Sequence, residues 1–357
     1  MQQQLNMMDL LKMAVEKRAS DLHITVGRPP VLRIDGELVD LDYEPLDPEA
    51  ARYLIYSILT HQQRDTFEDD SDLDFAYDHG QIGRFRVNLY RQKGFTGAAF
   101  RVIPSVIPSL EELGLPNIVA QLAMAPSGLV VITGPSGCGK STTLAAMIDI
   151  INTKRKCHIV TIEDPIEFLH QHKSSIVTQR EVANDTRSFQ TAMKHVLRHN
   201  PDVILIGEMR DLETMEMAIT AAETGHLVLT TLHTLDAPQA VDRIVDLFHP
   251  HQQQQIRTQL GGALRAVIAQ QLLPRASGSG LVPALEIMLA TPGIKNLIRK
   301  GETHQLYSVI QTGGQSGMQA MNQYLRGMVN ASLITAEVAE AHSPDAEELR
   351  RMLTSGL

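Results

Sequence analysis

Three glycines, a lysine and a Ser-Thr pair fall within the nine residues from Gly134 to Thr142. The segment reads Gly-Pro-Ser-Gly-Cys-Gly-Lys-Ser-Thr and fits the P-loop pattern in full. An apolar run at 129–133 predicts a strand before it, and helix-spaced apolar residues predict a helix after it. In that context the glycines let backbone N–H groups wrap phosphate at the positive end of the helix. The segment therefore predicts an ATP site.

Two residues of this segment have roles that follow from their chemistry. Lys140 is expected to reach the β- and γ-phosphates, and Ser141 is expected to ligate Mg²⁺. The other members of the predicted nucleotide site are Gly134, Ser136, Gly137, Cys138, Gly139 and Thr142.

A hydrolase also needs a carboxylate that positions water, and two predicted strands end in one. Glu163 closes the run that begins at Val160, and Glu208 follows a strand that starts at Asp202. Gly207 stands where P-loop ATPases usually carry an aspartate at the end of that strand. We predict that Glu208 orients the attacking water and that Glu163 supports the metal, directly or through water. The alternative is that both are solvated acids at strand ends.

Histidines flank the apolar run 227–231, with His226 before it and His233 after it. Either could contact the γ-phosphate or relay its loss. Either could equally tie a strand end to a backbone carbonyl, and the sequence does not separate the two interpretations.

A basic segment in an acidic chain is the last candidate. Residues 84–101 contain no carboxylate, whereas five acidic residues lie between 68 and 74. One interpretation is a clamp on nucleotide phosphate, supplied across a domain or subunit boundary. The other is a solvated face that pairs with the nearby acids. The basic residues are Arg84, Arg86, Arg91, Lys93 and Arg101.

The length of 357 residues predicts two domains, whose helices and strands must hold these candidate residues in place. The first hundred residues suggest an α+β unit, with a strand pair at 31–34 and 37–41 around Asp35-Gly36. From Gly128 onward, apolar strands alternate with helices, which indicates a buried, mostly parallel sheet. The runs 268–273 and 282–289 suggest a hairpin, and the remainder suggests helices, the last capped by Ser343. We expect domains at 1–103, 117–290 and 291–357, with a linker at 104–116.

Composition narrows the class of protein. The formal charge of −9 argues against coating nucleic acid by bulk electrostatics. Two cysteines are too few for a disulfide framework or a four-thiolate zinc site. Neither a transmembrane run nor a signal peptide is visible, so we expect a soluble, cytoplasmic protein.

These motifs together resemble the hexameric secretion and pilus ATPases, and within them the type IV pilus retraction ATPases, the PilT-like group. The resemblance implies an α/β fold: an N-terminal PAS-like α+β domain, a RecA-like P-loop ATPase domain and C-terminal helices. It rests on the motifs above and on the strings Ser20–His23, Gly83–Asn88, Ile162–Glu167, Gln179–Val182, Gly207–Thr214 and Ala222–His226.

The same resemblance implies partners and a place in the cell. It implies a homo-hexameric ring, peripheral at the cytoplasmic side of the inner membrane, where it works with an inner-membrane platform protein and the pilus machinery. A second retraction ATPase is a further expected partner, and nucleic acid is not expected. In such rings, basic residues of the N-terminal domain face nucleotide, which favours Arg84, Arg86 and Arg101 as members of the site.

The subtype follows from two features of the chain. Similar assembly and secretion ATPases usually carry an extra N-terminal domain and a four-cysteine zinc insertion, and this sequence shows neither, which favours retraction. Gly293–Ile298 stands where retraction types read Ala-Ile-Arg-Asn-Leu-Ile. We expect the apolar face of this segment, which includes Leu297, to pass motion to the pilus machinery. The alternatives are an assembly or secretion ATPase, a nucleotide-gated accessory scaffold, and a RecA-like nucleic-acid translocase.

Overall fold

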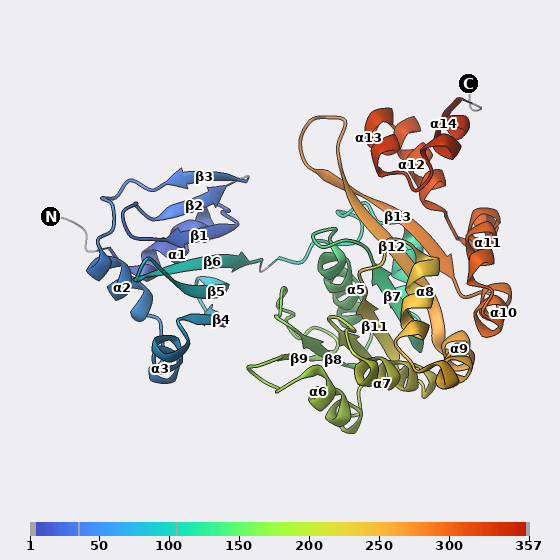
Figure 1. Cartoon of the computed structure of the whole chain (residues 1–357), viewed down its shortest axis with the longest axis horizontal. Coiled ribbons are helices and arrows are strands. Elements are labelled where there is room, and N and C mark those ends of the chain that lie inside the picture. Colours follow the sequence, from blue (N-terminus) through green and yellow to red (C-terminus); the bar gives the residue numbers. More distant parts are fainter. Residues whose placement is uncertain (1–4, 35, 105, 355–357) are drawn as a thin grey trace. The chain divides into compact units, whose positions relative to one another are not determined.

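The computed structural model describes residues 5–34, 36–104 and 106–354, and the chain divides into two compact units (Figure 1). The first unit comprises residues 1–106 with 167–169, and the second comprises 107–166 and 170–357. In the part of the chain that the structure describes, no helix is both long enough and apolar enough to span a membrane.

The first unit is an antiparallel sheet with helices on one face. The strand order is β3-β2-β1-β6-β5-β4. The predicted strand pair forms β2 and β3, and Asp35 of its turn lies outside the described residues. The helices are α1 (Met7–Glu16), α2 (Pro48–Tyr56) and α3 (His61–Asp70). The strands are β1 (Asp21–Ile24), β2 (Val31–Ile34), β3 (Glu37–Asp40), β4 (Asp72–His79), β5 (Gly83–Gln92) and β6 (Phe95–Ile103).

Alternation along β5 decides which face of this sheet is buried. Phe85, Val87 and Leu89 are fully buried and join the core formed with the helices. Arg84 and Arg86 alternate with these residues along the strand and therefore point to the opposite, polar face.

The second unit contains a seven-stranded sheet in the order β13-β12-β7-β11-β10-β8-β9. Every neighbouring pair is parallel except β12–β13, which forms the predicted hairpin. The sequence analysis predicts no strand at β9. Its residues are mostly polar, because β9 is an edge strand. The strands are β7 (Gly128–Thr133), β8 (His158–Glu163), β9 (Ile176–Glu181), β10 (Val203–Ile206), β11 (Leu227–Thr231), β12 (Leu264–Pro274) and β13 (Leu281–Leu289).

Helices cover both faces of this sheet. Along β7, Leu129 and Val131 face a core shared with α6 to α11, whereas Val130 and Ile132 face a core shared with α4 and α5. The strands are apolar on both faces for this reason. The helices are α4 (Asn117–Ala123), α5 (Lys140–Lys154), α6 (Phe189–Val196), α7 (Leu212–Glu223), α8 (Ala237–Asp246), α9 (Pro250–Ala263), α10 (Pro292–Lys300) and α11 (Leu306–Thr312).

Three further helices pack on the far end of the β12–β13 hairpin (red in Figure 1). They are α12 (Met321–Asn330), α13 (Ala336–His342) and α14 (Ala346–Thr354). The cap predicted for the last helix is wrong. Asp345, not Ser343, accepts the Glu348 N–H at 2.9 Å, and Ser343 instead accepts the N–H of Asp345.

The apolar face of α10 that was expected to pass motion lies mostly in the core. Ile294 and Ile298 are fully buried, whereas Leu297 is half-buried and packs against the same core. Ile294 and Ile298 therefore belong to the fold's interior, and a coupling role for Leu297 stays a prediction. Spacing alone could not distinguish a core face from a docking face, because both require the same periodicity.

Candidate active site

Four parallel strands deliver the predicted catalytic residues to one edge of the large sheet. In register, Ile162 of β8 lies beside Ile206 of β10, and Ile132 of β7 lies beside Thr231 of β11. The residues that follow these strands therefore emerge together at the carboxyl edge. This is the edge at which open α/β sheets bind ligands. The P-loop, Glu163, Glu208 and His233 all lie there.

The P-loop backbone requires its glycines. Gly134, Gly137 and Gly139 have φ values of 144°, 77° and 86°, in the region that side chains disfavour. A Cβ on Gly134 would lie 2.2 Å from the carbonyl oxygen of Gln270. No side chain caps the first turn of α5, so its backbone N–H groups are available to an anion. Ser141 and Thr142 lie in this first turn, half-buried, and Ser136 is exposed in the loop.

Lys140 closes this loop from within. Its ammonium group donates to the carbonyl oxygens of Gly134 at 2.8 Å and Pro135 at 2.9 Å. The side chain is 8% exposed, so a phosphate would replace two neutral carbonyls with an anionic partner. The geometry fits a nucleotide phosphate.

Cys138 belongs to the loop through its backbone. Its side chain is buried, and its carbonyl oxygen accepts a hydrogen bond from Gln270 at 2.7 Å. Burial raises the pKa of the thiol, although the Lys140 ammonium opposes that shift. Desolvation therefore outweighs the positive charge nearby, and the thiol form is favoured although Cys138 lies beside a helix N-terminus.

Gln270 is a site residue that the sequence analysis missed. It lies on β12 and is 2% exposed. Besides holding the Cys138 carbonyl, its Oε1 accepts from Oγ1 of Thr143 in α5 at 2.9 Å. One amide thus joins the loop and the helix that together form the phosphate cradle. More than a hundred residues separate Gln270 from the P-loop, so no local pattern could reveal it.

Glu208 lies among cationic and hydrogen-bonding groups. Its Oε1 is 2.7 Å from Nε of Arg210 and 3.1 Å from Nε2 of His233. Burial raises the pKa of Glu208, but Arg210, His233 and Lys140 together outweigh it, so the pKa lies below the ordinary range. The sequence analysis assigned no role to Arg210. Its position two residues after Glu208 could have indicated that the two side chains lie close together.

Glu163 is held by its own strand and by β9. Its Oε1 accepts from Oγ1 of Thr161 at 2.6 Å and from Nε2 of Gln179 at 3.1 Å. Gln179 also accepts the backbone N–H of His170 at 2.8 Å. The missed strand β9 therefore positions the carboxylate. A Cβ on Gly207 would lie 3.4 Å from Cα of Glu163, an ordinary van der Waals contact, so the approach of β8 to β10 does not itself require glycine at this position.

The two histidines lie at opposite ends of β11. His233 joins Glu208 at the carboxyl edge, whereas His226 precedes the strand at the amino edge. Nδ1 of His226 lies 2.9 Å from the carbonyl oxygen of Ala221, at the end of α7. Within this chain His226 does not join the site, and its geometry matches the strand-end alternative. The prediction that His226 contacts phosphate is therefore corrected for the site of this chain, because the length of β11 separates His226 at the amino edge from the P-loop at the carboxyl edge.

Arg84, Arg86 and Arg101 share the polar face of the first unit's sheet. Arg86 and Arg101 lie directly opposite each other on β5 and β6. Nε of Arg101 donates to Asp21 at 3.0 Å, and Nε of Arg86 lies 4.0 Å from Asp74. Both arginine side chains are about half exposed or more. Pairing with nearby acids, the alternative interpretation, is therefore observed for Arg86.

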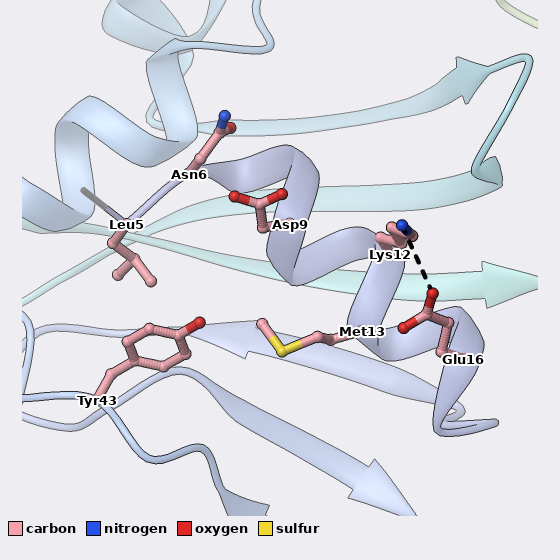
Figure 2. A pocket seen from close by; sticks show the side chains of 7 residues that line it. All are labelled: Leu5, Asn6, Asp9, Lys12, Met13, Glu16 and Tyr43. Atoms are coloured by element: carbon pink, nitrogen blue, oxygen red, sulfur yellow. Dashed lines mark ion pairs between the residues drawn. The ribbon is translucent and has the colours of Figure 1, made fainter. Parts of the chain in front are cut away.

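A separate pocket of about 250 Å³ opens on α1 of the first unit (Figure 2). Its polar groups come from Asn6, Asp9, Lys12, Glu16 and Tyr43, and Lys12 pairs with Glu16 at 3.7 Å. It contains none of the predicted site residues and lacks the backbone cradle that phosphate requires.

A P-loop at the carboxyl edge of a parallel sheet, with a carboxylate at the end of a neighbouring strand, defines a P-loop ATPase with a RecA-like domain. The family model described as Type II/IV secretion system protein matches residues 3–340. The chain belongs to this family.

Individual relatives cover nearly the whole chain. The type IV pilus retractation ATPase PilT of Pseudomonas aeruginosa is 47% identical over 331 residues, 93% of this chain and 96% of that protein. The type IV pilus ATPase PilU of the same organism is 44% identical, covering 97% of this chain and 91% of that protein. A crystal structure of the pilus retraction motor PilT with bound ADP superposes with a TM-score of 0.92 at 47% identity, over 98% of this chain and all of that one.

Proposed function

We propose that this chain is the ATP-hydrolysing motor of type IV pilus retraction. The observation that carries the proposal is the shared edge of one sheet, where a complete P-loop and Glu208 lie together. The pilus as the system in which the motor works is inferred from the named relatives, because they are pilus ATPases similar to this chain along almost their entire length.

Each residue has a role in the proposed hydrolysis. The P-loop N–H groups and Lys140 bind the β- and γ-phosphates, and Lys140 exchanges its two carbonyl partners for phosphate oxygens. Ser141 and Glu163 would hold Mg²⁺, which neutralises charge that develops on the phosphate oxygens. Glu208 orients the attacking water, and His233, in contact with Glu208, senses the loss of the γ-phosphate.

The active unit in this proposal is a homo-hexameric ring at the cytoplasmic face of the inner membrane, docked on a platform protein of the pilus machinery. Arg84, Arg86 and Arg101 would face nucleotide across a domain or subunit boundary. Their common face on the small sheet supports this role, because three cations on one surface suit a polyphosphate.

Cells that lack this protein test the proposal. We expect excess pili that fail to retract and loss of surface motility, restored by the parent gene but not by Lys140→Ala. Cells without any pili would contradict retraction and support an assembly ATPase. Unchanged pili and motility would contradict both functions.

A specific observation supports a second candidate, an accessory retraction motor that acts beside a second retraction ATPase. The PilU relative covers slightly more of this chain than the PilT relative does. Lys295 also offers a single ammonium group where retraction types carry an arginine. Retraction in cells where this chain is the sole retraction ATPase would identify a primary motor, and its absence an accessory one.

A further inference from the structure

Glu286 is a buried carboxylate that holds the first residues of two helices. It lies on β13 and is 2% exposed. Its Oε1 accepts the backbone N–H of Ala237, which begins α8, at 2.9 Å. The backbone N–H of Met321, which begins α12, faces the carboxylate and favours its charged form. The N-termini of helices favour negative charge, so both helices stabilise the carboxylate at this position.

The first of these helices follows the loop that carries His233. This loop, residues 232–236, is tied at its start by the Leu232 N–H, which donates to Ile132 at 3.0 Å. In its middle, Oγ1 of Thr133 donates to the carbonyl oxygen of Thr234 at 2.7 Å. Glu286 fixes the end of the loop through Ala237. These three contacts determine where His233 lies beside Glu208.

The second helix belongs to the C-terminal region. The segment before α12 pairs with β13 through Ile287 and Gln319, which exchange hydrogen bonds of 2.8 and 3.0 Å. Glu286 precedes Ile287, so the carboxylate lies where β13, the His233 loop and α12 meet. A movement of α12 would act directly on the group that holds the loop.

The chemistry of a carboxylate explains why glutamate occupies this position. Two backbone N–H groups approach it, and a carboxylate has two acceptor oxygens, whereas a glutamine amide has one acceptor and one donor. Burial raises the pKa of Glu286 to about 7, which means that its charge is costly there. An ionisable group kept at such cost, between two helix starts, performs a task that apolar packing could not.

We propose that Glu286 is a positioning residue that links the His233 loop to α12, so that the C-terminal helices and the ATPase site influence each other's geometry. The inference rests on the proposed ATPase function of this site. It adds Glu286, a residue outside the nucleotide cradle that lies on β13, the edge strand of the large sheet.

Two substitutions break the link in different ways. Glu286→Gln presents an N–H₂ group to one of the two backbone N–H groups and so loses one contact. Met321→Pro removes the other N–H while keeping a residue tolerated at the first helical position. Ala320 before it has φ −76° and ψ 152°, which a following proline accepts.

Matched controls separate the link from a general loss of stability. Met321→Ala removes the same side chain as Met321→Pro but retains the N–H. Glu348→Gln alters another carboxylate of the C-terminal region, which accepts from Tyr307 at 3.0 Å, from Gln311 at 2.6 Å and from the Asn322 amide of α12. It therefore disturbs a polar contact of α12 without removing either backbone N–H group that faces Glu286. The readouts are kcat and KM for ATP, melting temperature, and amide hydrogen exchange of residues 232–236 without nucleotide.

We expect Glu286→Gln and Met321→Pro to lower kcat about tenfold, with KM changed by less than about twofold. Exchange in residues 232–236 should rise in both, whereas the two controls should lower only the melting temperature. Parent values of kcat and exchange in both variants would overturn the inference, as would equal losses in the controls. A parent protein without ATPase activity would instead contradict the proposed function, and the exchange measurement would still test the link.

Discussion

Nε2 of His233 lies 3.1 Å from Oε1 of Glu208, so the histidine that follows β11 meets the carboxylate that follows β10. The two residues lie 25 positions apart in the sequence and come together because their strands are parallel neighbours. In the proposed mechanism this contact joins the carboxylate that orients water to the histidine that senses loss of the γ-phosphate, and it leads to several tests.

Glu208→Gln should abolish turnover and retain nucleotide binding. The amide keeps the shape of the side chain but loses the negative charge that orients water, so kcat should fall by about two to four orders of magnitude. Steady-state ATPase assays and binding of a fluorescent ATP analogue measure the two effects. Glu216→Gln, an exposed change on α7, is the matched control. Turnover at the parent rate would mean that another group positions the water.

Arg210→Ala should move the acid limb of the pH–rate profile to higher pH. Arg210 helps to lower the pKa of Glu208, so removing the guanidinium raises that pKa. In the proposed mechanism Glu208 acts in its ionised form. Activity should therefore be lost as pH falls through its pKa, and the variant should lose activity at a higher pH than the parent. The measurement is kcat/KM against pH, and an unshifted acid limb would contradict the assignment of this ion pair.

Gln270→Ala should weaken both the P-loop and nucleotide binding. It leaves the Cys138 carbonyl and the Thr143 hydroxyl without their buried partner, which should cost about 1–3 kcal/mol of unfolding free energy. Thermal unfolding and nucleotide titration test this, with the neighbouring, less buried Gln271→Ala as control. Equal affinity in both variants would show that the loop holds its shape without Gln270.

Specific ATPase activity should rise with protein concentration as rings assemble. An arginine supplied across a subunit boundary contributes on the order of a thousandfold in rate, and a monomer forfeits it. Activity measured over a dilution series, beside light scattering, makes the comparison. Arg101→Ala should flatten the dependence, and full activity in a sample shown to be monomeric would contradict the ring.

Ile298→Ala should destabilise the fold by about 2–5 kcal/mol, because the side chain is fully buried in the large core. Its melting temperature should fall well below that of Asn296→Ala, an exposed change on the same helix. Similar melting temperatures for the two variants would contradict the assignment of this face to the core.

Local chemistry identified the phosphate site. The P-loop segment requires glycines that adopt positive φ and a lysine at a fixed spacing from them. Because all of these residues lie within nine consecutive positions, the sequence alone shows the pattern. The apolar strands and the β12–β13 hairpin were predictable for the same reason, since burial on both faces leaves an uninterrupted apolar run. The two-residue period of β5 likewise places Arg84 and Arg86 on the face opposite the core.

Tertiary structure alone decided which distant residues complete the site. Three such residues are Gln270, Gln179 and Glu286, and the sequence patterns of their strands indicate only burial or an edge position. Each of the three acts through a hydrogen bond to another element, which forms when the sheet assembles. It also separated His233 from His226, which the sequence treats alike, because a parallel strand sends its two ends to opposite edges of the sheet. The spacing of residues in the sequence determines the face of a helix or strand on which each side chain lies. The hydrogen bonds between elements depend instead on the order in which the strands pair.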